Sequence, residues 1–222
     1  MSYRNKGNDV FRALAFACLL VPIASAQQTP ERSRTEGLKE TDRFIKTGGE
    51  TSESVGNAKL EVQKTLTAYN TLVTQPSKDM KGDYKKLLKS MDSMNKKVTE
   101  ATTKIGAMQG AGDAYFQGRS ETIKNIQDKS LQGQAQQRLQ QSQKEFAGVL
   151  ASLREAGEAL EPFRKQLADQ ITFLGSDLNP SATASLKPQA DKLNTGGAAV
   201  FKKADQAIEK ANNYFTGLKG QA

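Results

Sequence analysis

Residues 84–108, YKKLLKSMDSMNKKVTEATTKIGAM, contain the most regular pattern in the chain. Their apolar residues alternate between spacings of three and four and are Tyr84, Leu87, Met91, Met94, Val98, Ala101, Ile105 and Met108. This spacing is a heptad repeat, which places the apolar side chains along one stripe of an α-helix that packs on neighbouring helices. The stretch therefore predicts a long helix with one buried seam.

A second seam follows after a predicted turn at Gln127–Gly133. Its positions are Leu139, Phe146, Val149, Leu153, Ala156, Leu160, Phe163, Leu167, Ile171 and Leu174. Pro162 lies inside this seam. Because Leu160 and Phe163 stay in phase across the proline, we expect a kink in the helix and not a break.

A further helix is predicted before the first seam. Its apolar stripe covers residues 55–73, and Phe44 stands before it. Pro76 ends this helix because proline cannot continue a helical hydrogen-bond ladder. Ser77 and Asp79 are then well placed to cap the helix that carries the first seam.

The last predicted helix carries an apolar stripe over residues 186–218. The preceding segment, Gly175–Pro180 (GSDLNP), is rich in turn-forming residues and closes the second seam. Ser181 is expected to cap this last helix. Pro188 and the Gly196-Gly197 pair weaken its first half.

These segments predict an all-α fold. No stretch shows the period-two alternation that a half-buried strand requires. Helices joined by short turns reverse direction, so we expect an elongated antiparallel bundle of three to four long helices with coiled-coil seams. The bundle domain should cover residues 38–222 and follow a disordered polar leader at 27–37, QQTPERSRTEG.

Residues 1–26 have the features of a cleavable signal peptide. The cations Arg4, Lys6 and Arg12 precede a short apolar stretch at 13–23. Ala24-Ser25-Ala26 supplies the small residues that signal peptidase accepts, which predicts cleavage between Ala26 and Gln27. The protein is therefore expected to be exported, and to be soluble in the periplasm or outside the cell after cleavage.

Cys18, the only cysteine, raises the alternative of a lipoprotein. It follows Ala15-Phe16-Ala17, but the bulky Phe16 and five more apolar residues after Cys18 favour an uninterrupted signal segment. Lipidation is therefore not expected. Cleavage would remove Cys18 and leave a mature chain without cysteine, which must rely on apolar burial for its stability.

The composition argues against an enzyme. The chain has no His, so the usual general base and histidine metal ligands are missing. Ser93-Met94-Asn95-Lys96 has the spacing of a serine acyltransferase motif and Lys46-Thr47-Gly48 resembles its partner, but they occur in the wrong order. No catalytic residue, cofactor, metal site or small-molecule substrate is expected.

The charge suggests two ways of working. The formal net charge is +8, and removal of the signal peptide leaves +6. One hypothesis is an envelope scaffold that docks a protein partner or a second copy. The alternative is a module that binds an anionic polymer or a membrane surface through a basic face on Lys85, Lys86, Lys89, Lys96 and Lys97. Export makes nucleic acid an unexpected partner.

The chain resembles a known family, strongly over residues 139–193 and more weakly back to about residue 55, and residues 162–186 carry the most recognisable pattern. Pro162, Leu167, Asp169-Gln170, Leu174, Leu178-Asn179, Ala182 and Ser185-Leu186 form the pattern. It is similar to a family of exported bacterial coiled-coil proteins in the domain-of-unknown-function series, number twenty-nine fifty-nine. The resemblance implies a long helical bundle in the bacterial envelope or outside it, and carries over no functional residue. The family has a Trp after the position of Phe116, which this chain lacks.

Overall fold

A computed structural model describes residues 30–220 of the 222-residue chain. The helices are α1 (Pro30–Thr74), α2 (Met80–Lys124), α3 (Lys129–Ser176), α4 (Pro180–Ser185) and α5 (Lys187–Lys219). Residues 30–220 contain no strand, so the predicted all-α class is confirmed. The predicted signal peptide at 1–26 and its cleavage point, Ala26 and Gln27, lie outside the described residues.

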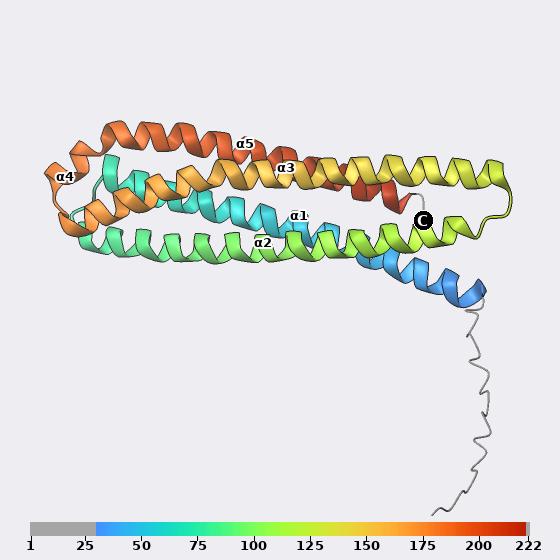
Figure 1. Cartoon of the computed structure of the whole chain (residues 1–222). Coiled ribbons are helices and arrows are strands. Elements are labelled where there is room, and N and C mark those ends of the chain that lie inside the picture. Colours follow the sequence, from blue (N-terminus) through green and yellow to red (C-terminus); the bar gives the residue numbers. More distant parts are fainter. Residues whose placement is uncertain (1–29, 221–222) are drawn as a thin grey trace, which may run out of the picture.

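The four long helices form an elongated antiparallel bundle (Figure 1). α1 packs on α2 and α5, and α3 packs on α5 and α2, so the four surround a shared core. α4 is a short helix at the end where α3 passes into α5. With 48 residues at about 1.5 Å each, α3 is roughly 70 Å long.

Side-chain caps explain where three of the helices begin. The Asp79 carboxylate accepts a hydrogen bond from the Gly82 amide at 2.9 Å, as predicted for the start of α2. The Asp128 carboxylate accepts from the Ser130 amide at 2.8 Å and begins α3. α3 therefore starts earlier than predicted, because this cap closes the turn before residue 129.

α4 begins at Pro180, one residue before the predicted cap, Ser181. The Asn179 side chain accepts a hydrogen bond from the Ala182 amide at 2.9 Å, and Pro180 occupies the first helical position. Ser181 therefore lies inside the helix, and its prediction as a cap was wrong. Asparagine is favoured as a cap, and proline is favoured directly after it because its missing amide proton has no helical partner there.

α1 also begins earlier than the sequence predicted. Residues 30–37 were expected to belong to a disordered leader, but α1 starts at Pro30 and includes them. Proline suits the first position of a helix, and the helix continues through Gly37 although glycine lowers its stability. Residues 27–29 lie outside the described part.

The first seam is divided between two environments. Leu87, Met94, Ala101 and Met108 are buried, whereas Met91, Val98 and Ile105 are half-buried. One row of the heptad thus points into the core and the other lies at the edge between α2 and α3. In α3, Leu139, Phe146, Val149, Leu153, Phe163, Leu167, Ile171 and Leu174 are buried, and the helix continues through Pro162.

Aromatic side chains concentrate in one part of the core. Phe44 of α1 lies at the centre and contacts rings from the other three long helices: Tyr115, Phe116, Phe146, Tyr214 and Phe215. Its ring centroid is 4.9 Å from that of Phe146, at 86° between the planes. Edge-to-face pairs of this kind add stability beyond the area that they bury.

Candidate functional site

The predicted basic face lies on α2, and the structure divides it. Lys86 pairs with Asp83 at 3.1 Å, and Lys97 pairs with Glu100 at 2.6 Å. Lys85, Lys89 and Lys96 are exposed and have no ion pair with any residue from 30 to 220. They recur at spacings of four and seven, which places them along one stripe of the helix.

We call Lys85, Lys89 and Lys96 the lysine stripe. Asp92 is exposed on the same stripe and reduces its positive charge. The pKa of Glu100 is lowered by its hydrogen bond and ion pair with Lys97, and the charge of Lys96 lowers it slightly more. The structure therefore leaves three of the five predicted lysines available for an anionic partner.

A second feature is an apolar hollow that residues of all four long helices line. The solvent-accessible part of its apolar lining lies on α2 and α3, and we call it the wall hollow. It has a volume of about 80 Å³. Half-buried Val98 and Ile105 of α2 and Ala156 and Leu160 of α3 line it, together with exposed Gly157. A side chain added at Gly157 would meet no atom within 4 Å. The hollow therefore opens to solvent beside a glycine.

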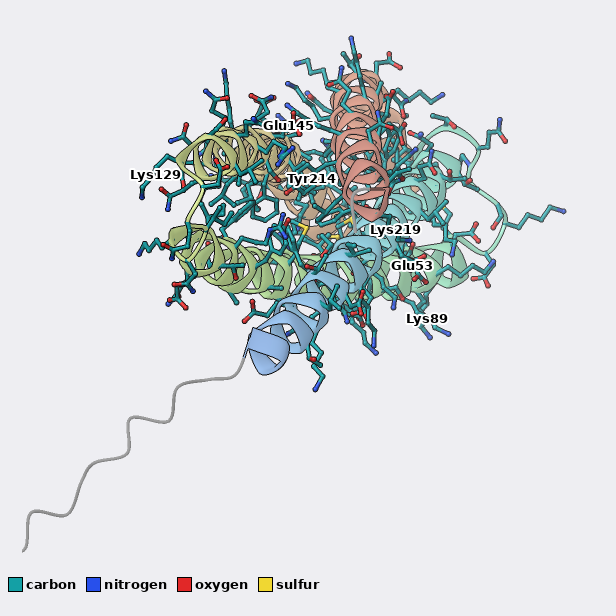
Figure 2. The ribbon with its side chains drawn as sticks, turned by 90° about the vertical axis from the view of Figure 1, so that its right-hand side faces the viewer. Glu53, Lys89, Lys129, Glu145, Tyr214 and Lys219 are labelled. Carbon is teal, nitrogen blue, oxygen red and sulfur yellow. The ribbon has the colours of Figure 1, made fainter. Side chains whose placement is uncertain are left out.

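A third feature is a cleft of about 560 Å³ toward the end of the bundle at which α2 passes into α3. We call it the end cleft; Figure 2 looks along the bundle from this end and shows Tyr214 between α3 and α5. Its lining residues are Tyr115, Arg119, Ile123, Ala135, Arg138, Leu139, Gln141, Ser142, Glu145, Asn213, Tyr214, Gly217 and Leu218. They belong to α2, α3 and α5.

The end cleft contains a polar group of side chains around Tyr214. The hydroxyls of Tyr214 and Ser142 share a hydrogen bond of 2.9 Å. Burial, with smaller contributions from Tyr115 and Glu145, raises the pKa of Tyr214 to about 12, although the hydrogen bond with Ser142 acts in the opposite direction. The Gln141 amide donates to the Glu145 carboxylate at 2.7 Å. Tyr214 therefore stays protonated at neutral pH.

Two arginines stand in the same cleft. Arg119 belongs to α2 and Arg138 to α3, and both side chains are exposed. Neither has an ion pair or hydrogen bond with any residue from 30 to 220. Arg119 acts on Tyr115 electrostatically and partly offsets the burial that raises the pKa of this tyrosine. Glu145 is the only carboxylate in the lining.

The sequence did not reveal the end cleft. Arg119 and Arg138 are 19 residues apart along the chain, and no local motif connects them. The hairpin of α2 and α3 places both in the lining of one cleft, and α5 adds Tyr214 from a third segment. Only the antiparallel pairing of the two seams could have indicated that these positions share one end of the bundle.

The two fragments that resemble a serine acyltransferase motif do not form a site. Lys46-Thr47-Gly48 lies within α1, where Gly48 packs against Phe215. Ser93 and Lys96 lie on α2, and Lys96 is exposed. Within residues 30–220, no three His, Cys, Asp or Glu side chains come together as a metal site would require. No helix in that range is long and apolar enough to cross a membrane.

Comparison with known proteins gives the family. Residues 31–218 match a family described as proteins of unknown function, DUF2959. This chain belongs to DUF2959. The DUF2959 match runs from the second residue of α1 to the penultimate residue of α5, so it covers the whole bundle and confirms the resemblance seen in residues 162–186. No curated protein and no solved structure matches the chain.

Proposed function

We propose that this DUF2959 protein is a non-enzymatic, exported envelope scaffold that docks a protein partner or a second copy on its helical wall. The observation that carries the proposal is the wall hollow. Val98 and Ile105, from the half-buried row of the first seam, and half-buried Leu160 of α3 line it and keep part of their apolar surface open to solvent. A helix that inserts apolar side chains into a groove of this kind would complete their burial.

The wall between α2 and α3 supports this proposal in a second way. Thr102 and Gly157 border the hollow and are exposed, so small residues surround its mouth. Small residues allow the backbone of another helix to come close. A partner side chain can therefore reach Val98 and Ile105 without displacing any bulky residue at the rim.

A substitution at Gly157 tests this docking surface. Gly157→Gln places a side chain at the mouth of the hollow, and Gly133→Gln is the matched control. Both glycines lie on α3, both are exposed, and neither Cβ would meet an atom within 4 Å. Both variants should fold and melt like wild type or slightly higher, because glutamine favours a helix over glycine.

Two measurements read out the result. Light scattering of the purified mature chain reports a second copy, and a pull-down from envelope extract with quantitative mass spectrometry reports a different partner. We expect association in one of the two, lost in Gly157→Gln and retained in Gly133→Gln. A monomer without a specific partner, or association that both variants retain, contradicts the proposal.

Export rests on residues 1–26 and has a separate test. The proposal predicts that the chain purified from the periplasm or the medium begins at Gln27. Mass spectrometry of the intact protein measures this directly. A full-length chain that starts at Met1 and stays in the cytoplasm would contradict it.

The lysine stripe favours a second function, binding to an anionic membrane surface. Lys85, Lys89 and Lys96 are the exposed, unpaired part of the basic face within residues 30–220. A cation near an anionic membrane contributes about 1 kcal/mol, so three of them together contribute on the order of a hundredfold in affinity. Ionic screening should weaken this binding as salt rises.

Vesicles of phosphatidylglycerol and phosphatidylcholine test the stripe. Replacement of Lys85, Lys89 and Lys96 by glutamine should abolish vesicle binding. Replacement of Lys86 and Lys97 should leave most of it, because these two lysines already pair with Asp83 and Glu100. Equal losses in the two variants would show that only total charge matters and would exclude a specific stripe.

A further inference from the structure

We propose that the end cleft binds a small hydroxylated organic anion of the acidic saccharide class. This site is separate from the wall hollow and from the lysine stripe, and it does not depend on the function proposed above. Its volume of about 560 Å³ is in the range of small-molecule sites. Three features of the lining argue for this class of ligand.

The first feature is unpaired positive charge. Arg119 and Arg138 extend from the two helices of one hairpin and line the same cleft. Glu145, the one carboxylate in the lining, already accepts a hydrogen bond from Gln141. A guanidinium binds a carboxylate or phosphate through paired N–H donors, and the cleft has two such groups in its lining.

The second feature is a set of uncharged hydrogen-bonding groups. Tyr214 and Ser142 present hydroxyls, and Gln141 and Asn213 present amides. Each of these groups can both donate and accept a hydrogen bond, as a sugar hydroxyl does. Because they stand on both α3 and α5, the body of the ligand needs polar groups on more than one side. An alkyl chain would offer no hydrogen bond to Asn213 or to the remaining donor and acceptor positions of the other three groups.

The third feature is the apolar surface between the polar groups. The rings of Tyr115 and Tyr214 and the side chains of Leu139 and Leu218 line the same cleft. A pyranose ring has polar edges and apolar C–H faces, so it can use both kinds of surface at once. Aromatic side chains with a polar tip suit such mixed contacts.

A titration of the folded chain tests the proposal. The chain has no Trp, so tyrosine fluorescence is the intrinsic signal, and two of the five tyrosines line the cleft. The probes are glucuronate and glucose 6-phosphate, with glucose and inorganic phosphate as controls. Amide NMR spectra then show which residues respond.

We expect saturable binding of glucuronate or glucose 6-phosphate, with amide shifts at residues of the end cleft. Both glucose and inorganic phosphate should bind at least about tenfold more weakly, because glucose lacks the anionic group and inorganic phosphate lacks the sugar ring with its hydroxyls. Arg119→Gln with Arg138→Gln should weaken binding of the acidic sugar by about tenfold or more. Both arginines are exposed, so the variant should keep the helical circular dichroism of wild type.

Lys165→Gln with Lys187→Gln removes the same charge from exposed positions outside the end cleft and the lysine stripe, and it should leave acidic-sugar binding unchanged. The proposal is overturned if neither acidic sugar gives saturable binding. It is also overturned if the two arginine substitutions leave the affinity unchanged. Inorganic phosphate or glucose that binds as tightly as the acidic sugars would equally contradict it.

Discussion

At the scale of single residues, the glycines of this chain have two different roles. A Cβ at Gly112 would lie 2.6 Å from the ring of Phe146 and 3.0 Å from that of Phe44. A Cβ at Gly106, six residues earlier on α2, would meet nothing within 4 Å. Gly112 thus makes room for the aromatic core, whereas Gly106 only reduces the stability of the helix.

This difference predicts opposite effects of the same substitution. Gly106→Ala should raise the free energy of unfolding by about 0.5–1 kcal/mol, because alanine favours the helix. Gly112→Ala should lower it by about 1–3 kcal/mol, because the added methyl displaces buried rings. Urea denaturation followed by circular dichroism measures both. Equal effects at the two positions would contradict the packing described around Phe44.

Buried tyrosines predict a loss of stability at high pH. Burial raises the pKa of Tyr69 and of Tyr214 from 10.0 to about 12. Between these values the unfolded chain loses the phenolic proton while the folded chain keeps it, so the free energy of unfolding falls as pH rises. Below pH 10 the contribution is complete.

Denaturation at pH 9, 10, 11 and 12 measures this loss of stability. Lysines also lose their charge in this range, but they do so equally in wild type and variant and cancel in the comparison. Tyr214→Phe should show a smaller fall across this range than wild type, since one of the buried tyrosines is gone. If Tyr214 were exposed, the free energy of unfolding would fall with pH equally steeply in wild type and in Tyr214→Phe. An unchanged slope in Tyr214→Phe would show that this hydroxyl is not protected by burial.

At the scale of the helices, the predicted seams were accurate and the predicted ends less so. Periodicity located the buried rows, because a stripe of apolar residues needs only the geometry of one helix. The ends depend on competition between neighbouring caps. Asn179 precedes Pro180 and outcompetes Ser181, which stands inside the helix. Asp128 likewise begins α3 before the end of the predicted turn.

The corrected cap gives a direct comparison. Asn179→Ala should lower the free energy of unfolding by about 1 kcal/mol, because the Ala182 amide loses its acceptor. Ser181→Ala should change it by less than about 0.5 kcal/mol. Thermal melting of both variants provides the measurement. A larger loss in Ser181→Ala would restore the cap predicted from the sequence.

The seam of α3 can be tested by one buried charge. Leu153 is 4% exposed and belongs to the cluster around Phe44. Leu153→Asp should lower the free energy of unfolding by roughly 3 kcal/mol or more, because an unpaired carboxylate would be buried. Ala147→Asp, on the exposed face of the same helix, should cost under about 1 kcal/mol. Similar melting temperatures for the two variants would contradict the assigned seam.

At the scale of the whole molecule, the sequence predicted the class of fold and its elongated antiparallel arrangement. It predicted neither the wall hollow nor the end cleft. Both arise where helices distant in sequence approach each other, and Val98 or Arg119 alone has no feature that marks it as part of a site. The five-lysine basic face could be predicted because α2 alone carries it. The ion pairs of Lys86 and Lys97 reduce it to the three residues of the lysine stripe.

The central claim is that the chain works by docking on the wall between α2 and α3, and in-cell photo-crosslinking tests it most directly. A photoreactive residue replaces Thr102, which is exposed at the rim of the wall hollow. The account predicts a discrete adduct, either with a second copy or with one envelope protein, that disappears in Gly157→Gln and persists in Gly133→Gln. An absent adduct, or one that Gly157→Gln leaves intact, would contradict the account.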